Sequence, residues 1–278
     1  MSFNSCQLCG SSNLVLLQII DEKPERETDF GIPPGKYRRS IYRCVECSVY
    51  NNFNNFDLTG LYSHSYNNAT YKNDILNKYN QIMGFPYEKS DNRQRVSRIV
   101  QYFKKNGRVM TGLKVLDIGS GLCVFLGELL KHGIEAHCVD PDFISVEHAL
   151  NNVHVKSAIK GGFENYPMDQ KFDLISFNKV LEHVLNPIDL LLKAKSLLDH
   201  NGFIYIELPD GENASGNGGY LDREEFYIEH YTAFDKESVQ LLIEKAGLNC
   251  QNVNEIHEPS DKYTLNLFLN KKSGESVS

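Results

Sequence analysis

The sequence of 278 residues lacks any apolar run approaching the roughly 20 residues that a helix needs to cross a bilayer. Its first residues contain Cys6 and Cys9 and have neither the basic start nor the apolar stretch of a secretory signal. We therefore expect a cytoplasmic protein with no membrane partner. In that reducing compartment, clustered cysteines are typical of metal sites rather than of disulfides.

An excess of positive charge is also missing. The chain has 29 Lys and Arg against 36 Asp and Glu, a formal net charge of −7. A surface built to grip nucleic acid is normally basic, so the balance argues against a nucleic-acid partner. The chain has no internal repeat either. Its hydrophobic share of 41% is sufficient for an ordinary globular core.

Short apolar runs alternate with helical segments through most of the chain. Strands are expected at 113–119, 135–140, 153–158, 172–180, 202–209, 248–256 and 263–272, and helices at 124–132, 143–151, 187–199 and 235–246. Alternation of this kind predicts an α/β fold, a doubly wound and mainly parallel sheet of seven strands. The last two strands have no helix between them and should pair antiparallel at one edge. Asp235 is the expected N-cap of the last helix.

The texture of the sequence suggests four regions. Residues 1–56 carry two CxxC pairs, 57–108 are rich in Tyr and Asn and look helical, 109–272 hold the alternating pattern, and 273–278 form a polar tail expected to be disordered. The middle region should fold over a cofactor-binding edge. There Tyr62, Tyr66 and Tyr71 would line an acceptor pocket, and Arg93, Arg95 or Arg98 would meet a carboxylate or phosphate, unless they simply face solvent.

A glycine bend between the first of these strands and its helix is the main ligand-binding signal. It comprises Asp117, Gly119 and Gly121, and a second strand-end acid, Asp140, follows. Glycines let the chain turn sharply and let a ligand approach the backbone, and an acid at the next strand end can accept hydrogen bonds from a ribose. Position 124, where a dinucleotide fold has its third glycine, is Val. An acid before the first glycine suits an amino group better than a pyrophosphate.

These segments resemble a known family. VLDIGSGLCVFL (115–126), VDPD (139–142) and FDLISFNKVLEHVLNP (172–187) are similar to ordered motifs of the class I S-adenosylmethionine-dependent methyltransferases, in a resemblance spanning residues 113–272. It implies S-adenosylmethionine as cofactor. Asp117, Gly119 and Gly121 would then hold its methionine end and Asp140 its ribose, with Pro141, Asp142, Gly162 and Phe163 around the adenine and Asn178 on the sulfonium side. Core packing is the alternative for Phe163.

The N-terminal cysteines form two knuckle-like pairs, Cys6 with Cys9 and Cys44 with Cys47. Four thiolates at this spacing suit one tetrahedral Zn²⁺, and a closed four-sulfur site is structural rather than catalytic. A redox pair or fortuitous cysteines are the alternatives. Cys123, Cys138 and Cys250 are expected to be core residues. A zinc-binding ribbon before this fold resembles two groups, methyltransferases of nucleotide-linked sugars and of ribosomal RNA, and the acidic balance favours the first.

Two Glu-His pairs are candidates for chemistry at the carboxyl ends of the strands. The segment around Tyr227, Glu229 and His230 resembles the catalytic segment of zinc-containing sugar C-methyltransferases. That implies His230 as general base and Tyr227 as its helper. His183 follows Glu182 in the other pair and is a further catalytic candidate, or a residue that shapes the pocket. The preceding segment, 210–226, could act as a lid.

These inferences favour one function. We expect a methyltransferase acting on a small molecule, a sugar or a nucleotide-activated metabolite, in surface-polysaccharide or secondary-metabolite synthesis. The chain ends almost where the core sheet ends, without the extra domain of the sugar C-methyltransferases, so oxygen or nitrogen is favoured as the acceptor atom over carbon. The alternatives are an RNA methyltransferase and a non-catalytic zinc-ribbon protein that uses the sheet to bind a partner.

Overall fold

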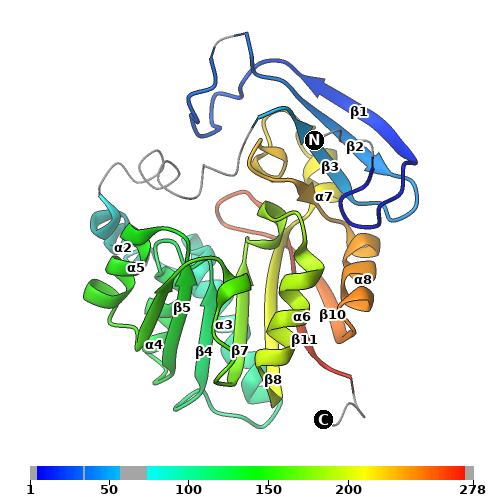
Figure 1. Cartoon of the computed structure of the whole chain (residues 1–278). Helices are drawn as coiled ribbons and strands as arrows, with labels where there is room; N and C mark the ends of the chain where they lie inside the picture. The colour runs from blue at the N-terminus through cyan, green and yellow to red at the C-terminus, as the bar shows by residue number, and fades with distance from the viewer. Residues whose placement is uncertain (1–4, 34, 57–73, 273–278) are drawn as a thin grey trace.

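The computed structural model describes residues 5–33, 35–56 and 74–272, and within these ranges the chain forms two sheets (Figure 1). The larger sheet has seven strands in the order β10-β11-β8-β7-β4-β5-β6, and the smaller has four in the order β1-β2-β3-β9. The strands are β1 Leu14–Ile20, β2 Arg39–Cys44, β3 Tyr50–Asn54, β4 Lys114–Ile118, β5 Glu135–Asp140, β6 Ser157–Lys160, β7 Phe172–Asn178, β8 Leu198–Pro209, β9 Thr232–Ala233, β10 Leu248–His257 and β11 Tyr263–Lys271.

From β4 to β8 the described α-helices alternate with the strands, except that β6 and β7 are joined by a 3-10 helix, whereas α2 and α3 both precede β4. The α-helices are α2 Ile75–Met83, α3 Asp91–Lys105, α4 Val124–Leu130, α5 Phe143–His148, α6 Pro187–Leu197, α7 Gly211–Gly216 and α8 Lys236–Lys245. Short 3-10 helices lie at η2 Tyr87–Lys89, η4 Phe163–Asn165, η5 Leu181–His183 and η6 Glu224–Phe226, and a π-helix at η3 Ala149–Val153. Asp235 caps α8 by accepting from the Ser238 amide at 2.9 Å, which confirms the expected N-cap.

The seven-stranded sheet confirms the predicted α/β architecture. Strands β6, β5, β4, β7 and β8 run parallel to one another, whereas β11 runs antiparallel to both β8 and β10. The final strand pair is therefore antiparallel at one edge, as expected. The order reverses between β4 and β7, and ligands of open α/β sheets bind at such a switch point, outside the carboxyl ends of the strands.

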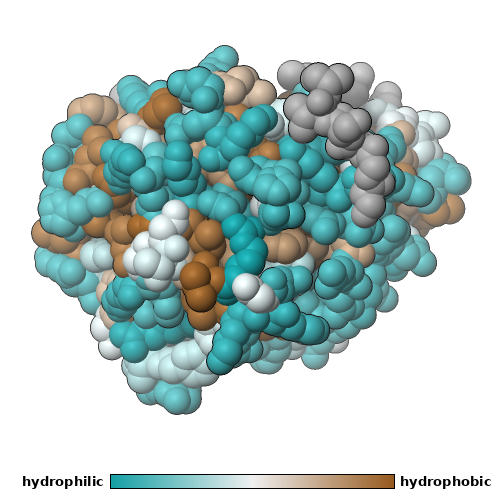
Figure 2. Space-filling view, turned by 90° about the horizontal axis from the view of Figure 1, so that it is seen from below, coloured by the Kyte–Doolittle hydropathy of each residue, from teal (hydrophilic) through white to brown (hydrophobic). Residues whose placement is uncertain are grey.

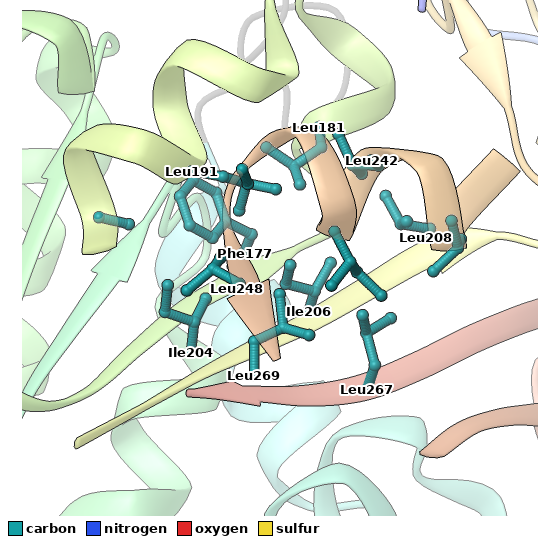
Figure 3. Packing of buried hydrophobic residues seen from close by; sticks show 14 of the residues in the cluster. Phe177, Leu181, Leu191, Ile204, Ile206, Leu208, Leu242, Leu248, Leu267 and Leu269 are labelled. Atoms are coloured by element: carbon teal, nitrogen blue, oxygen red, sulfur yellow. The ribbon is translucent and has the colours of Figure 1, made fainter. Parts of the chain in front are cut away.

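Helices cover both faces of this sheet because each face is lined by buried aliphatic and aromatic side chains. On one face α6 and α8 pack on β7, β8 and β11, with Leu191, Leu242 and Ile206 fully buried among them (Figure 3). On the other face α3 and α4 pack on β4 and β5, with Ile99 and Leu126 in the contact. Burial of a side chain of this size stabilises the fold by about 1.5–3 kcal/mol.

The third strand of the pattern begins later than predicted. Residues 153–156 were expected to open it, but β6 starts at Ser157. The helix after β5 continues as the π-helix through Val153, and His154 then takes a left-handed conformation with φ of 63°. Val153 and Val155 are buried in the same apolar cluster as α4. Their apolar character therefore reflects packing between the helix end and the core rather than pairing in the sheet.

The N-terminal strands are joined to a distant part of the chain. Strand β9, at residues 232–233, pairs antiparallel with β3, and Tyr50 lies opposite Ala233. Around this pairing Ile41, Tyr50, Phe226 and Ile228 share an apolar cluster. Figure 1 shows the small sheet beside the carboxyl-end edge of the larger one, with α7 next to β3. The segment after β8 is therefore anchored on the N-terminal sheet.

The outer surface is largely hydrophilic on the face in Figure 2, where hydrophobic residues lie in patches between polar ones. Within the ranges given above, no helix combines the length and the apolar character needed to cross a bilayer. Helices α2 and α3 account for most of the described part of the expected helical region. Tyr62, Tyr66, Tyr71 and the tail 273–278 lie outside the described residues.

Candidate functional site

The glycine bend after β4 has the backbone that its sequence predicts. Gly119 and Gly121 have φ angles of 67° and 48°, in the left-handed region that favours glycine. A Cβ at Gly119 would lie 2.9 Å from Cγ2 of Val180, in the loop after β7. The bend therefore needs glycine at position 119 for space as well as for conformation.

Asp140, at the end of β5, is tied directly to that bend. One carboxylate oxygen accepts from the Gly121 amide at 2.8 Å and the other from the Asp142 amide at 2.9 Å. A carboxylate oxygen can accept more than one hydrogen bond, so both retain capacity for a ligand. Burial raises the pKa of Asp140 to about 6, against the opposing effect of the two amides.

Asp117 is buried at the centre of the same edge. Its Oδ1 accepts from Ser176 at 2.6 Å and from Asn178 Nδ2 at 2.9 Å, so both neighbours on β7 orient it. Burial raises the pKa of Asp117 to about 7. A cation bound beside this carboxylate would favour its ionised form.

A cavity of about 450 Å³ opens at this edge, within the size range of small-molecule and cofactor sites. The structure brings all eight predicted cofactor-binding residues to it: Asp117, Gly119, Gly121, Asp140, Pro141, Gly162, Phe163 and Asn178. Phe163 also packs in the core, which is the alternative interpretation of this residue. Two buried oxygens at this edge, Oδ1 of Asn178 and Oγ of Ser120, have no hydrogen-bond partner among the described residues. The cavity thus has polar atoms available for a ligand.

Arg95 also lines this cavity, and the sequence did not single it out from its neighbours on α3. Its guanidinium lies 2.5 Å from Oε2 of Glu207, and that of Arg98 lies 3.0 Å from Oε1. Burial raises the pKa of Glu207, but the two arginines outweigh this and hold it below its usual range. Arg93 instead donates to the Met83 carbonyl. Because the three arginines lie on one helix, their positions in the sequence do not show which of them lines the cavity. The tertiary structure identifies Arg95.

A second cavity of about 270 Å³ adjoins the first, and Lys179 and His183 line both. All four predicted catalytic residues lie around it: Tyr227, Glu229, His230 and His183. Its other lining residues are almost all polar, with Glu182, Glu224, Glu225, Arg26, Thr28 and Lys262 joined by Pro209. The sequence identified the residues from the strand ends but not Arg26 or Lys262, which reach the cavity from distant segments.

The two histidines in this cavity are oriented by backbone carbonyls. Nδ1 of His230 lies 3.0 Å from the Glu225 carbonyl, and Nδ1 of His183 lies 3.0 Å from the Glu229 carbonyl. A carbonyl only accepts, so each Nδ1 carries the hydrogen and each Nε2 keeps its lone pair. The rings are 4.6 Å apart, centroid to centroid. Both imidazoles are thus held as potential proton acceptors.

Burial shifts the ionisation of this cluster. It lowers the pKa of His183 to about 4, and burial together with His183 lowers the pKa of His230 well below its usual value. It raises the pKa of Glu182 and of Glu229 to about 7. Both imidazoles are therefore neutral at pH 7.

Glu182, His183 and His230 also present ligand atoms within 4.8 Å of one another, a grouping that some divalent cations accept. However, the ammonium groups of Lys179 and Lys262 line the same cavity. Lys262 pairs with Glu224 at 2.9 Å, and Glu225 and Glu229 also line this cavity, so its lining carries charges of both signs.

The four N-terminal cysteines converge as their spacing predicts. Their sulfurs all lie within 4.8 Å of one another, with 3.5 Å between Cys6 and Cys47 and 3.5 Å between Cys9 and Cys44. Tetrahedral Zn²⁺ with sulfurs at 2.3 Å requires sulfur–sulfur distances of roughly 3.8 Å, so the cluster has suitable dimensions for the ion. Cys123 and Cys138 are fully buried core residues as expected, whereas Cys250 is only partly buried.

Comparisons with known proteins agree with this geometry. Residues 86–253, more than half of the chain, match the model of a methyltransferase domain family. A ubiquinone biosynthesis O-methyltransferase of Pasteurella multocida is 32% identical over 121 residues, which are 38% of this chain and 50% of that protein. Another, of Rickettsia bellii, is 24% identical over 149 residues, 52% of this chain and 57% of that protein. The chain therefore spans about half the length of the curated relatives it matches.

Solved structures share the fold. The magnesium protoporphyrin IX methyltransferase of Synechocystis PCC 6803, with bound SAH, superposes with a TM-score of 0.57 at 15% identity, covering 78% of this chain and 100% of that one. A S-adenosylmethionine-dependent methyltransferase of Clostridium acetobutylicum gives 0.54 at 14% identity, covering 74% and 98%. At such identities the likeness establishes the Rossmann-like fold of the larger sheet.

Proposed function

Because this chain belongs to the methyltransferase domain family, we propose that it transfers a methyl group from S-adenosylmethionine to a small polar acceptor. The observation that carries the proposal is the pair of adjoining cavities at the carboxyl-end edge of the sheet. The first has carboxylates and a glycine bend suited to a nucleoside joined to an amino acid. The second has neutral imidazoles suited to taking a proton from an acceptor. His183 and Lys179 lie where the two meet.

The first cavity fits the cofactor through its own polar groups. Asp140 would accept from the ribose hydroxyls, beside the amide hydrogen bonds it already receives. Asp117 would face the amino group, whose positive charge would keep this raised-pKa carboxyl ionised. Arg95, at the cavity wall, would meet the carboxylate of the methionine end beside its contact with Glu207.

The second cavity would orient the acceptor and take up its proton. When bound, S-adenosylmethionine supplies an electrophilic methyl group for in-line displacement by an acceptor atom. Nε2 of His230 would receive the proton of the acceptor hydroxyl or amine, because its Nδ1 is committed to the Glu225 carbonyl. Tyr227 and Glu229 would orient the acceptor, and His183 would border the cofactor.

The acceptor itself is proposed from the lining of this cavity and from the relatives. Charged and hydroxyl-bearing groups dominate the lining and suit a molecule with several polar groups, such as a sugar or a nucleotide-activated metabolite. The curated relatives are O-methyltransferases, which supports oxygen as the acceptor atom. We place the reaction in the cytoplasm, where the seven free cysteines would stay reduced.

The four-cysteine cluster is proposed as a structural zinc site. Cys6, Cys9, Cys44 and Cys47 offer four sulfurs at distances close to those of a tetrahedral ion. With all four positions filled by protein ligands, the ion would stabilise the N-terminal sheet and take no part in methyl transfer. Strand β2 ends at Cys44, so the cluster holds one end of that sheet.

The test is a screen with S-adenosylmethionine carrying a labelled methyl group. Nucleotide sugars and glycans are offered beside polyphenols and RNA, and label transfer to a sugar-bearing acceptor supports the proposal. Transfer to RNA, with binding that falls steeply as salt rises, would favour the RNA alternative. Absence of measurable S-adenosylmethionine affinity by calorimetry would point instead to a non-catalytic protein.

A further inference from the structure

The segment that carries His230 is held in place largely by side chains of the N-terminal sheet. Arg39, on β2, is fully buried, and its guanidinium donates to the carbonyl of Phe226 and, at 3.4 and 3.3 Å, to those of Tyr220 and Leu221. A guanidinium offers five donors in a fixed plane, so one side chain can satisfy several carbonyls at once. These carbonyls lie on the chain just before the catalytic candidates.

Two further side chains hold the same segment. Oε1 of Glu27 accepts from the Ile228 amide at 2.8 Å and lies 4.0 Å from Nε of Arg39. Nδ2 of Asn52, on β3, donates to the Phe226 carbonyl at 3.0 Å and the Tyr227 carbonyl at 2.9 Å. The N-terminal region therefore contacts the backbone on both sides of Tyr227.

These contacts reach the imidazole through the backbone. The Glu225 carbonyl, one residue before the carbonyl that Arg39 binds, accepts from Nδ1 of His230. On the other side the Tyr231 amide donates to the Glu182 carbonyl at 2.8 Å, while the Tyr231 carbonyl accepts from the Asn52 amide at 2.9 Å. The direction in which Nε2 of His230 points thus depends on where residues 225–231 are held.

Arg39 itself lines neither cavity. We propose that Arg39 is a positioning residue, which fixes the backbone of residues 220–230 and through it the His230 imidazole in the acceptor cavity. The expected effect of Arg39 on turnover rests on the proposed methyl transfer, whereas its expected effect on the backbone of residues 220–230 does not. The N-terminal sheet then belongs to the acceptor side of the enzyme, while the larger sheet holds the cofactor.

The physical reason is the cost of taking donors away from backbone carbonyls, of which that of Phe226 is buried. Replacing Arg39 by Met keeps much of its volume but removes the guanidinium donors to the carbonyls of Phe226, Tyr220 and Leu221, and leaves Asn52 as the described side chain that still donates to Phe226. Lysine keeps the positive charge but lacks the planar arrangement of several N–H donors, so it can donate to only some of these three carbonyls. The segment should loosen, and the imidazole with it, whereas the glycine bend after β4 has none of these contacts.

The test uses the full chain and compares Arg39→Met and Arg39→Lys with Arg38→Met. Arg38 is adjacent, over half exposed, and its one ion pair in the described part of the chain is with Asp21 on the surface, so it is a matched control. Hydrogen exchange read by mass spectrometry should rise in peptides covering 220–231 in Arg39→Met, by roughly tenfold or more, and remain unchanged in 115–141. Arg39→Lys should lie between, and Arg38→Met should match the wild type.

The second readout is methyl-transfer activity, measured with the acceptor that the labelled-methyl screen identifies. Arg39→Met should lower kcat by roughly 10²-fold, with the Kd for S-adenosylhomocysteine within about twofold, and Arg39→Lys should recover part of the loss. Unchanged exchange in 220–231, or equal losses of cofactor affinity and turnover, would overturn the positioning role. If Arg39→Met does not fold, Arg39→Lys and Asn52→Ala answer the same question. If no acceptor is found, the exchange pattern still decides the structural claim, and cofactor affinity separately tests the proposed function.

Discussion

Removal of the Asp140 carboxylate should separate the cofactor assignment from the rest of the mechanism. In Asp140→Ala the ribose hydroxyls would lose the acceptor proposed for them, and the amides of Gly121 and Asp142 would lose theirs as well. A hydrogen bond to a charged group contributes about 1.5–3 kcal/mol. Loss of the two hydrogen bonds proposed between the ribose and Asp140 amounts to about 3 kcal/mol or more, which is roughly a 10²-fold or greater rise in the Kd of the cofactor.

The same carboxyl predicts how cofactor affinity depends on pH. Burial raises the pKa of Asp140 to about 6, and the ionised form is the one that accepts from all of its partners. As the pH decreases, affinity should fall first through about 7, where Asp117 gains a proton, and more steeply through about 6, where a proton on Asp140 also competes with the ligand. The Asp140→Ala variant should lack the second of these two steps.

Calorimetric titration of S-adenosylhomocysteine provides the measurement. Asp199→Ala is the control, because Asp199 lies near the opposite end of the sheet, is 42% exposed in its side chain and bonds to its neighbour His200. Thermal unfolding checks that each variant is folded. A Kd within twofold of the wild type in Asp140→Ala would refute the assignment of the β5 end to the ribose.

Three further outcomes are expected. His230→Ala should lower turnover by roughly 10²-fold or more with cofactor affinity unchanged, as for loss of a positioned base, and wild-type turnover would remove His230 from the mechanism. Because burial lowers the pKa of His230, its protonation should lower kcat only when the pH drops below the ordinary histidine range; a pH–rate profile with no fall beyond the step that Glu182 and Glu229 can cause near pH 7 would contradict this. Cys44→Ser should lose one zinc per chain by elemental analysis, whereas Cys250→Ser should keep it, and an equal metal content in both would rule out the four-sulfur site.

Much of the larger sheet could be predicted from the sequence because its signals are local. Buried strands such as β4 and β7 are short apolar runs, and the bend between β4 and α4 needs glycine at Gly119 for reasons of backbone conformation and space. The β6 boundary was the main error. There the apolar residues Val153 and Val155 pack as the end of a helix, and apolar character alone does not distinguish that from a strand.

The candidate site divides in the same way. Asp117 and Asp140 lie in the last two residues of β4 and β5, and parallel strands end at one edge, so their proximity follows from the pattern. Which of the three arginines of α3 lines the cavity cannot be predicted from the pattern. It depends on which side of that helix faces the cavity and on where Glu207 lies. Lys262 reaches the second cavity from the loop before the last strand, and the residues around it in the sequence give no indication of this position.

The sequence by itself determined the order of the strands of the larger sheet and of the helices between them, the glycine bend with its two acids, and the four cysteines, because each depends on neighbours within a few residues or on a fixed spacing. The tertiary structure alone decided that β9 joins the N-terminal sheet and that Arg39 holds the carbonyl of Phe226. Those contacts join segments nearly two hundred residues apart. They form only when the apolar side chains of the N-terminal sheet and of residues 226–233 pack together. The buried guanidinium of Arg39 then donates to carbonyls of a segment that is distant in the sequence.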